Sequence, residues 1–198
     1  MSTARILEAA ERLFSERGFA QTTMQDIVAD AGTSIGNLYF YFENKDQLLQ
    51  ALVENALAEA HRRGDELAAR VAPGPARMAV VMFSNASVLL APGSRLLAIL
   101  KQTSGNVLAD HVATRNSDRI RRYMADNLPQ LDPALLDYAS RVWTGAGRGA
   151  IEAHTRQSEL DLWDTAEFAV RWNLRGVGVP ENQIDEAVAV ARRIHNAT

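Results

Sequence analysis

Apolar residues recur at helical spacing along most of the chain, and no segment alternates with the two-residue period of a β-strand. The first 19 residues carry one such stripe, made of Ile6, Leu7, Ala10, Leu13 and Phe14. Two shorter segments follow, with apolar positions at Ile27, Val28 and Ala31 and then at Ile35, Leu38 and Phe42. Short amphipathic helices bury little surface alone, so these three should share one small core.

A tight turn separates the two short helices. Gly32 stands where the first of them must end, and a residue without a Cβ readily takes the left-handed conformation that redirects the chain. Thr33 or Ser34 can then cap the next helix by accepting from its free backbone N–H groups. Together with the preceding helix, which should end at Gly18, this pattern predicts a helix-turn-helix.

A long helix is predicted next, from the cap residue Asn44 to about Val71, where a Pro-Gly-Pro sequence stops it. Further helices are predicted at 76–91, 95–101, 107–128, 133–156, 162–174 and 180–195. We therefore expect an all-α protein with about ten helices. An N-terminal three-helix domain (1–49) is joined by the long connecting helix to a larger helical domain (50–198).

Composition limits the classes of protein that fit. The chain has 198 residues, of which 47% are hydrophobic, which is enough for a substantial core. It has no cysteine, which excludes disulfides and thiolate metal sites, and we predict neither a metal nor a cofactor. Charged residues interrupt the N-terminus, and no apolar run approaches the ~18 residues of a membrane span, so we expect a cytoplasmic protein.

The groove-facing helix of a helix-turn-helix lies in the major groove of DNA with its first residues near the base edges. The side chains expected there are Ser34, Ile35, Gly36, Asn37 and Phe40, with Gln25 of the preceding helix as a further candidate. Asn37 can donate and accept at once, as adenine requires, and Ile35 or Phe40 can meet a thymine methyl. Gly36 permits close approach of the backbone to DNA.

The charge balance argues against DNA binding when it is summed over the first 48 residues. They hold four basic and seven acidic side chains, a net charge of −3, whereas residues 49–198 hold 17 of each. DNA-binding modules are usually basic. Residues 31–42 carry no charge, however, so we expect binding that depends only modestly on salt, because few cations displace counterions.

The pattern Thr-Thr, Asp-Ile, Ala-Gly and Ser-x-Gly-x-Leu-Tyr-x-Tyr-Phe-x-x-Lys, followed by Leu48 and Leu49, resembles the N-terminal domain of the TetR family of transcriptional regulators. The resemblance covers about the first 50 residues. It implies a DNA-binding regulator, usually a repressor, with a C-terminal ligand-binding and dimerisation domain. A small-molecule effector would release the dimer from a palindromic operator.

Phosphate contacts need hydrogen-bond donors. The candidates are Thr22, Thr23, Tyr39, Tyr41 and Lys45. The resemblance implies backbone contacts at the last four; tyrosine stands at 41 where the family often has histidine, and the family's frequent basic N-terminal arm is missing. The alternative is that the aromatic residues 39–42 pack the core, as we expect for two of them including Phe42, and that Lys45 only begins a solvated helix.

Small residues crowd the segment 139–153. Glycine in a helix costs about 1 kcal/mol relative to alanine, so Gly145, Gly147 and Gly149 call for close approach of another helix. Helices at 134–156 and 161–174 would form the homodimer interface that the resemblance implies. Alternatively, these glycines make room inside one subunit or break the helix.

A pocket for the effector is expected among apolar residues with a few polar groups. The candidates are Met82, Phe83, Asn85, Leu100, His111, Trp143, Phe168 and Trp172. Met82 and Phe83 also suit plain core, and His111 suits a surface position. No motif identifies the effector.

The signatures of enzymes are missing: there is no phosphate-binding glycine loop, no HExxH and no Glu-x-x-His pair. We therefore expect no catalytic residue. The acidic first domain leaves one alternative, a helical ligand-binding or adaptor protein that does not read DNA specifically.

Overall fold

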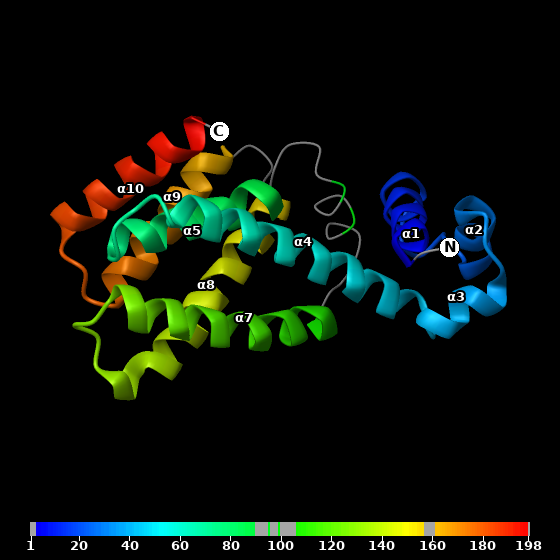
Figure 1. Ribbon diagram of the computed structural model, residues 1–198, viewed down its shortest axis with the longest axis horizontal. Helices are drawn as coiled ribbons and strands as arrows, with labels where there is room; N and C mark the ends of the chain where they lie inside the picture. Colours follow the sequence, from blue (N-terminus) through cyan, green and yellow to red (C-terminus); the bar gives the residue numbers. More distant parts are fainter. Residues whose placement is uncertain (1–2, 90–94, 96–98, 100–105, 157–160, 198) are drawn as a thin grey trace.

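The computed structural model describes residues 3–89, 95, 99, 106–156 and 161–197, and all regular structure among them is helical (Figure 1). The elements are α1 (Thr3–Arg17), α2 (Met24–Ala31), α3 (Ile35–Tyr41), α4 (Lys45–Ala68), α5 (Pro75–Leu89), α7 (Asn106–Asn127), the 3-10 helix η1 (Pro133–Leu135), α8 (Leu136–Arg156), α9 (Leu162–Gly176) and α10 (Glu181–Asn196). The predicted all-α fold is thus confirmed. The helix predicted at 95–101 lies mostly outside the described residues.

The first three helices share an apolar core with the start of α4. Phe14, Ile27 and Leu38 are fully buried in it, as their spacing predicts. The helix α1 ends at Arg17, and the next residue, Gly18, takes a positive φ of 97° and donates its backbone N–H to the carbonyl of Phe14. This core fixes the orientation of α2 and α3.

The turn between α2 and α3 has the predicted chemistry. Gly32 is left-handed, with φ 61° and ψ 43°, and its N–H donates to the carbonyl of Val28. Of the two candidate caps, Ser34 caps α3: its hydroxyl accepts from the backbone N–H of Asn37 at 3.2 Å. The turn therefore presents α3 as a short helix with a defined start.

The helix α4 runs without interruption from the N-terminal core to the larger C-terminal one (Figure 1). Asn44 caps it as predicted, accepting from the backbone N–H of Gln47 at 2.9 Å. Its first turns contribute Leu48 to the N-terminal core, and its last turn contributes Leu67 to the other. It ends at Ala68, before the predicted Val71. The domain boundary at residues 49 and 50 stays a prediction.

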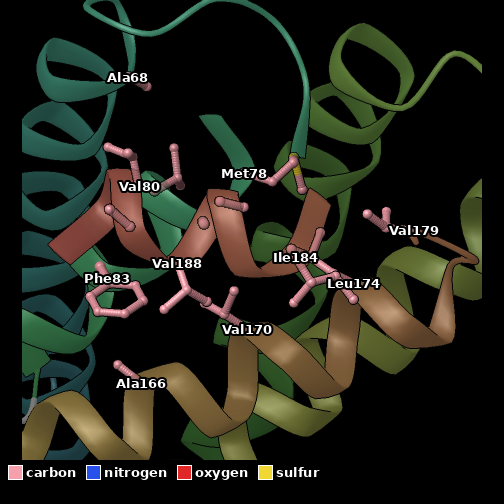
Figure 2. Packing of buried hydrophobic residues seen from close by; sticks show 14 of the residues in the cluster. Ala68, Met78, Val80, Phe83, Ala166, Val170, Leu174, Val179, Ile184 and Val188 are labelled. Carbon is pink, nitrogen blue, oxygen red and sulfur yellow. The ribbon is translucent and has the colours of Figure 1, made fainter. Parts of the chain in front are cut away.

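The larger core surrounds α5, which packs against α4, α9 and α10. In Figure 2 side chains from α5, α9 and α10 point toward one another, among them Phe83, Val170 and Val188. Gly64 of α4 lies against α5, where an added Cβ would be in ordinary van der Waals contact, 3.5 Å from the Cβ of Ser84. The far end of the connecting helix is thereby packed firmly into the C-terminal helices.

Polar contacts connect α7 to helices on two sides. Asp65 of α4 accepts from the Arg119 guanidinium at 2.5 Å and from the Tyr123 hydroxyl at 2.9 Å. Burial and this carboxylate raise the pKa of Tyr123 to about 12. The buried Ser117 hydroxyl donates to Thr144 of α8 at 3.1 Å. The connecting helix and α8 are therefore both linked to α7.

Candidate nucleic-acid interface

The helix α3 exposes one face and buries the other. Leu38 is fully buried, and Phe42, directly after the helix, is also in the core. Ile35 is 41% exposed and Phe40 is 80% exposed. Sequence reasoning placed Ile35 both on the core face and at the groove; the structure contradicts the first, because only Leu38 and Phe42 face α1 and α2.

The aromatic run at 39–42 packs inward less than expected. Tyr39, Phe40 and Tyr41 are all exposed, and only Phe42 is buried. The expectation that two of the four fill the core is therefore wrong. The helix α3 has seven residues and buries only Leu38, so of the aromatic run only Phe42, which follows the helix, reaches the core. The two phenol groups face solvent, where they are available as hydrogen-bond donors.

Asn37 and Gly36 occupy the first turn of α3. The side-chain amide of Asn37 donates from Nδ2 to the hydroxyl of Thr33 at 2.8 Å, which orients it over the turn. Gly36 is exposed, and a Cβ built on it would meet no atom within 4 Å. Ser34 is exposed beside them, and Gln25 is exposed on α2.

The two adjacent threonines before α2 differ in exposure. Thr22 is fully buried, and its hydroxyl donates to the carbonyl of Gly18 at 2.8 Å. This contradicts its assignment as a phosphate ligand, because its donor is used inside the protein. Thr23 is exposed and forms a capping box with Asp26. Its hydroxyl accepts from the backbone N–H of Asp26 at 3.1 Å and donates to Asp26 Oδ2 at 2.6 Å, so this donor is also engaged within the domain. Its hydrogen bonds are the main cause of the lowered pKa of Asp26.

Lys45 is already engaged within the domain. Its Nζ donates to the carbonyl of Phe19 at 2.8 Å and to that of Ala20 at 3.3 Å, and it lies 4.8 Å from the centre of the Phe19 ring. The lysine therefore ties the loop after α1 to the start of α4. Sequence reasoning missed these contacts because Phe19 and Lys45 are far apart along the chain.

Ion pairs account for part of the acidic charge near α2. Asp30 is paired with Arg12, and Asp26 lies 3.9 Å from Arg17, both arginines coming from α1. The carboxylates are partly neutralised, but the same pairs hold two of the few cations of this region. Contacts to DNA would therefore depend on hydroxyls, amides and Lys45 more than on free charge.

Only some of the predicted pocket residues lie together in the larger core. Phe83 and Trp143 are buried and Met82 is partly buried. Asn85 carries a buried Oδ1 without a hydrogen-bond partner. Leu100 and the side chain of His111 lie outside the described residues.

Phe168 and Trp172 do not lie in an interior pocket, contrary to the prediction. They are 68% and 60% exposed on the surface of α9, with their rings stacked at 6.3 Å, so neither lines an interior site. One helical turn separates them, and their face of α9 points away from the core that Ala169 and Val170 enter.

Other exposed apolar side chains lie on and just before α8, namely Leu135, Tyr138 and Val142. Gly145 and Gly149 continue the Tyr138–Val142 face at helical spacing, and a Cβ built on either would meet no atom within 4 Å. At these two positions, then, glycine makes no room inside the subunit. The signal that sequence reasoning overlooked was this spacing from Tyr138 onward.

The described residues contain no group of three or more His, Cys, Asp or Glu side chains placed to hold a metal ion. None of the helices in these ranges is long and apolar enough to cross a membrane.

Comparison with known proteins identifies the N-terminal part. Residues 6–52 match the family described as bacterial regulatory proteins, tetR family. The HTH-type transcriptional regulator TtgR of Pseudomonas putida is 42% identical over 101 residues, 49% of this chain and 48% of that protein. The chain thus spans about half the length of TtgR. The HTH-type transcriptional repressor KstR2 of Rhodococcus jostii is 24% identical over 181 residues, 88% of this chain and 80% of that protein.

The similarity of fold to solved structures covers nearly the whole chain. The crystal structure of RolR in complex with resorcinol has a TM-score of 0.74 and 23% identity, covering 96% of this chain and 92% of that one. This match concerns the fold, whereas the family match concerns the sequence that builds α1, α2 and α3. The N-terminal helix-turn-helix domain of this chain thus matches the tetR family of bacterial regulatory proteins.

Proposed function

We propose that this protein is a DNA-binding transcriptional repressor that leaves a palindromic operator when a small-molecule effector binds. The observation that carries the proposal is α3, a capped, uncharged and exposed helix in a domain of a regulator family. The exposed Gly36 and Phe40 and the partly exposed Asn37 suit contacts with base edges. Tyr39, Tyr41 and Lys45 supply donors for phosphates, and Thr23 adds one when its hydroxyl turns from Asp26 toward the DNA.

Dimerisation through α8 and α9 is part of the proposal. The exposed pair Phe168 and Trp172 and the face of Tyr138 and Val142 supply apolar surface that one subunit leaves uncovered. A two-fold dimer carries two copies of α3, which read half-sites separated by about 34–36 Å, one turn of DNA.

We propose the effector site between α5, α7 and α8. Trp143 and Met82 supply apolar surface, and the unpaired Oδ1 of Asn85 accepts a hydrogen bond from the effector. An effector shifts the equilibrium only through a difference in affinity between the DNA-bound and released states. The connecting helix α4, linked to α7 through Asp65, transmits that difference to the N-terminal domain. No catalytic step is assigned to any residue.

The proposal is tested by selecting duplexes from a random DNA pool with the full-length protein, followed by footprinting and affinity measurements at several salt concentrations. We expect enrichment of a palindromic sequence and a shallow dependence of affinity on salt, because few cations contact phosphates.

The control is a protein carrying Asn37→Ala and Tyr39→Phe together, which should fold normally and lose the selected sequence. If neither protein enriches any duplex at low salt, the chain is instead a helical ligand-binding or adaptor protein, the reading that its acidic first domain favours.

A further inference from the structure

Phe40 exposes more of its side chain than any other large apolar residue that the structure describes. It is 80% exposed and belongs to neither buried cluster. Its ring meets the edge of Tyr41 with centroids 5.0 Å apart, but Tyr41 is itself exposed. The contacts of α3 within the chain therefore leave most of this ring to an outside partner.

Gly36 lies one turn before Phe40 on the same face of α3. Its φ is not positive, and an added Cβ would meet nothing within 4 Å, so neither backbone conformation nor internal packing requires glycine there. Glycine weakens a helix relative to alanine. The open space beside the Phe40 ring is thus available to a group that approaches from outside.

The partner must suit an uncharged surface, because α3 and its caps carry no ionisable acid or base other than the tyrosine phenols. Base edges in the major groove present hydrogen-bonding groups, and the C5-methyl of thymine is their apolar group. We propose that Phe40, beside the gap left by Gly36, contacts the C5-methyl of a thymine in each operator half-site. Phe40 then determines operator specificity at that position. This inference rests on the DNA-binding function proposed above.

Ile35 is the other apolar side chain of α3 that was predicted to contact the C5-methyl of thymine. It lies five residues from Phe40, and five residues turn a helix by about 140° beyond a full turn, so the two side chains point in different directions. Ile35 is also only half as exposed, at 41%. It serves as the matched control, since it is apolar and on the same helix.

The test begins with the duplex selected by the full-length protein. Each thymine is replaced in turn by deoxyuridine, which lacks only the C5-methyl. We expect one thymine per half-site at which uracil weakens binding about fourfold, the equivalent of about 0.8 kcal/mol for one buried methyl-sized group. Phe40→Ala should bind the thymine and uracil duplexes equally, whereas Ile35→Ala should keep the fourfold preference.

The possible outcomes distinguish the role of Phe40 from the proposed DNA-binding function. If a duplex is selected but no uracil weakens the native protein, or if Phe40→Ala keeps the preference, Phe40 is not the methyl reader and the regulator proposal stands. If no duplex is selected, both fall. Thermal melting checks that Phe40→Ala remains folded, as we expect for so exposed a side chain.

Discussion

At the residue scale, several groups that suit DNA by their chemistry are used inside the protein. Thr22 donates to a backbone carbonyl, Lys45 donates to two, and Arg12 pairs with Asp30. Gly36 is the opposite case, because nothing in the chain needs it to be glycine. Which side chains are free to contact DNA therefore depends on their exposure and their hydrogen-bond partners. Residue type alone does not predict it.

Gly36→Ala should stabilise the protein and weaken its binding to DNA. Alanine is favoured over glycine in a helix by up to about 1 kcal/mol, and the added methyl meets no atom of the chain. Denaturant unfolding and operator affinity measure the two effects. Gly32→Ala is the control: its φ of 61° is strained for alanine, so it should destabilise by about 1 kcal/mol. Equal operator affinity for Gly36→Ala and the native protein would mean that DNA does not approach this position.

Lys45→Ala should weaken binding to all sequences alike and reduce the slope of log affinity against log salt by about one. The ammonium must turn from the carbonyls of Phe19 and Ala20 toward a phosphate, or be shared between them. Arg70→Ala removes one exposed positive charge just beyond the far end of α4 and should leave the slope unchanged. A lower melting temperature with an unchanged slope would show that Lys45 acts only within the domain.

At the element scale, a buried hydrogen bond joins α5 to α10. His195 Nδ1 lies 2.9 Å from the carbonyl of Ala191, which can only accept, so Nδ1 carries the proton and Nε2 accepts from the Ser84 hydroxyl at 2.9 Å. The imidazole also packs beside Phe83 and Trp163. The last turn of the chain is thereby fixed to α5 by a neutral histidine.

This arrangement predicts a stability that falls in mild acid. Burial is the main cause of the lowered pKa of His195, and Arg63 lowers it further. The unfolded chain, whose histidine has a pKa near 6.5, then binds the proton more readily than the folded one. The stabilisation is complete above pH 6.5 and is lost as the pH falls toward the lower pKa of the folded state.

Denaturant unfolding between pH 5 and 7.5 measures this effect, and His195→Gln should flatten the slope while keeping a partner for Ser84. The carboxylates of Asp26, Glu59, Glu167 and Glu181 have lowered pKa values, so their loss of stability comes at lower pH and does not interfere. An identical slope in the variant would assign the pH dependence to other groups.

At the scale of the whole molecule, ion pairs fix the helix α9 on one face, while another of its faces is exposed. Arg171 and Arg192 both bind Glu167, and Arg171 also reaches Asp185 of α10 at 2.7 Å. The neighbouring face, about 100° around the helix, carries the stacked pair Phe168 and Trp172. A helix fixed this way presents its apolar face in a constant orientation, as a specific interface requires.

Trp172→Glu should convert a dimer into a folded monomer with much weaker operator binding, because a buried interface carboxylate without a partner is costly. Sedimentation measures the oligomeric state, and circular dichroism the folding. Phe40→Glu is the matched control, since it also places a carboxylate at an exposed aromatic position. It should leave the oligomeric state unchanged. A dimer that persists in Trp172→Glu would rule out this face of α9 as the interface.

The sequence by itself determined the local features: the order of the helices, the left-handed turn at Gly32, the cap at Asn44, and a cap at Thr33 or Ser34, of which the structure selects Ser34. These depend on contacts within a few residues, so spacing and residue type suffice. Only the tertiary structure decided that Thr22 is buried, that Lys45 binds Phe19, and that Phe168 and Trp172 face outward. Each of these depends on residues distant in the chain, and apolar periodicity cannot distinguish a face that packs inside one subunit from a face left open for a partner.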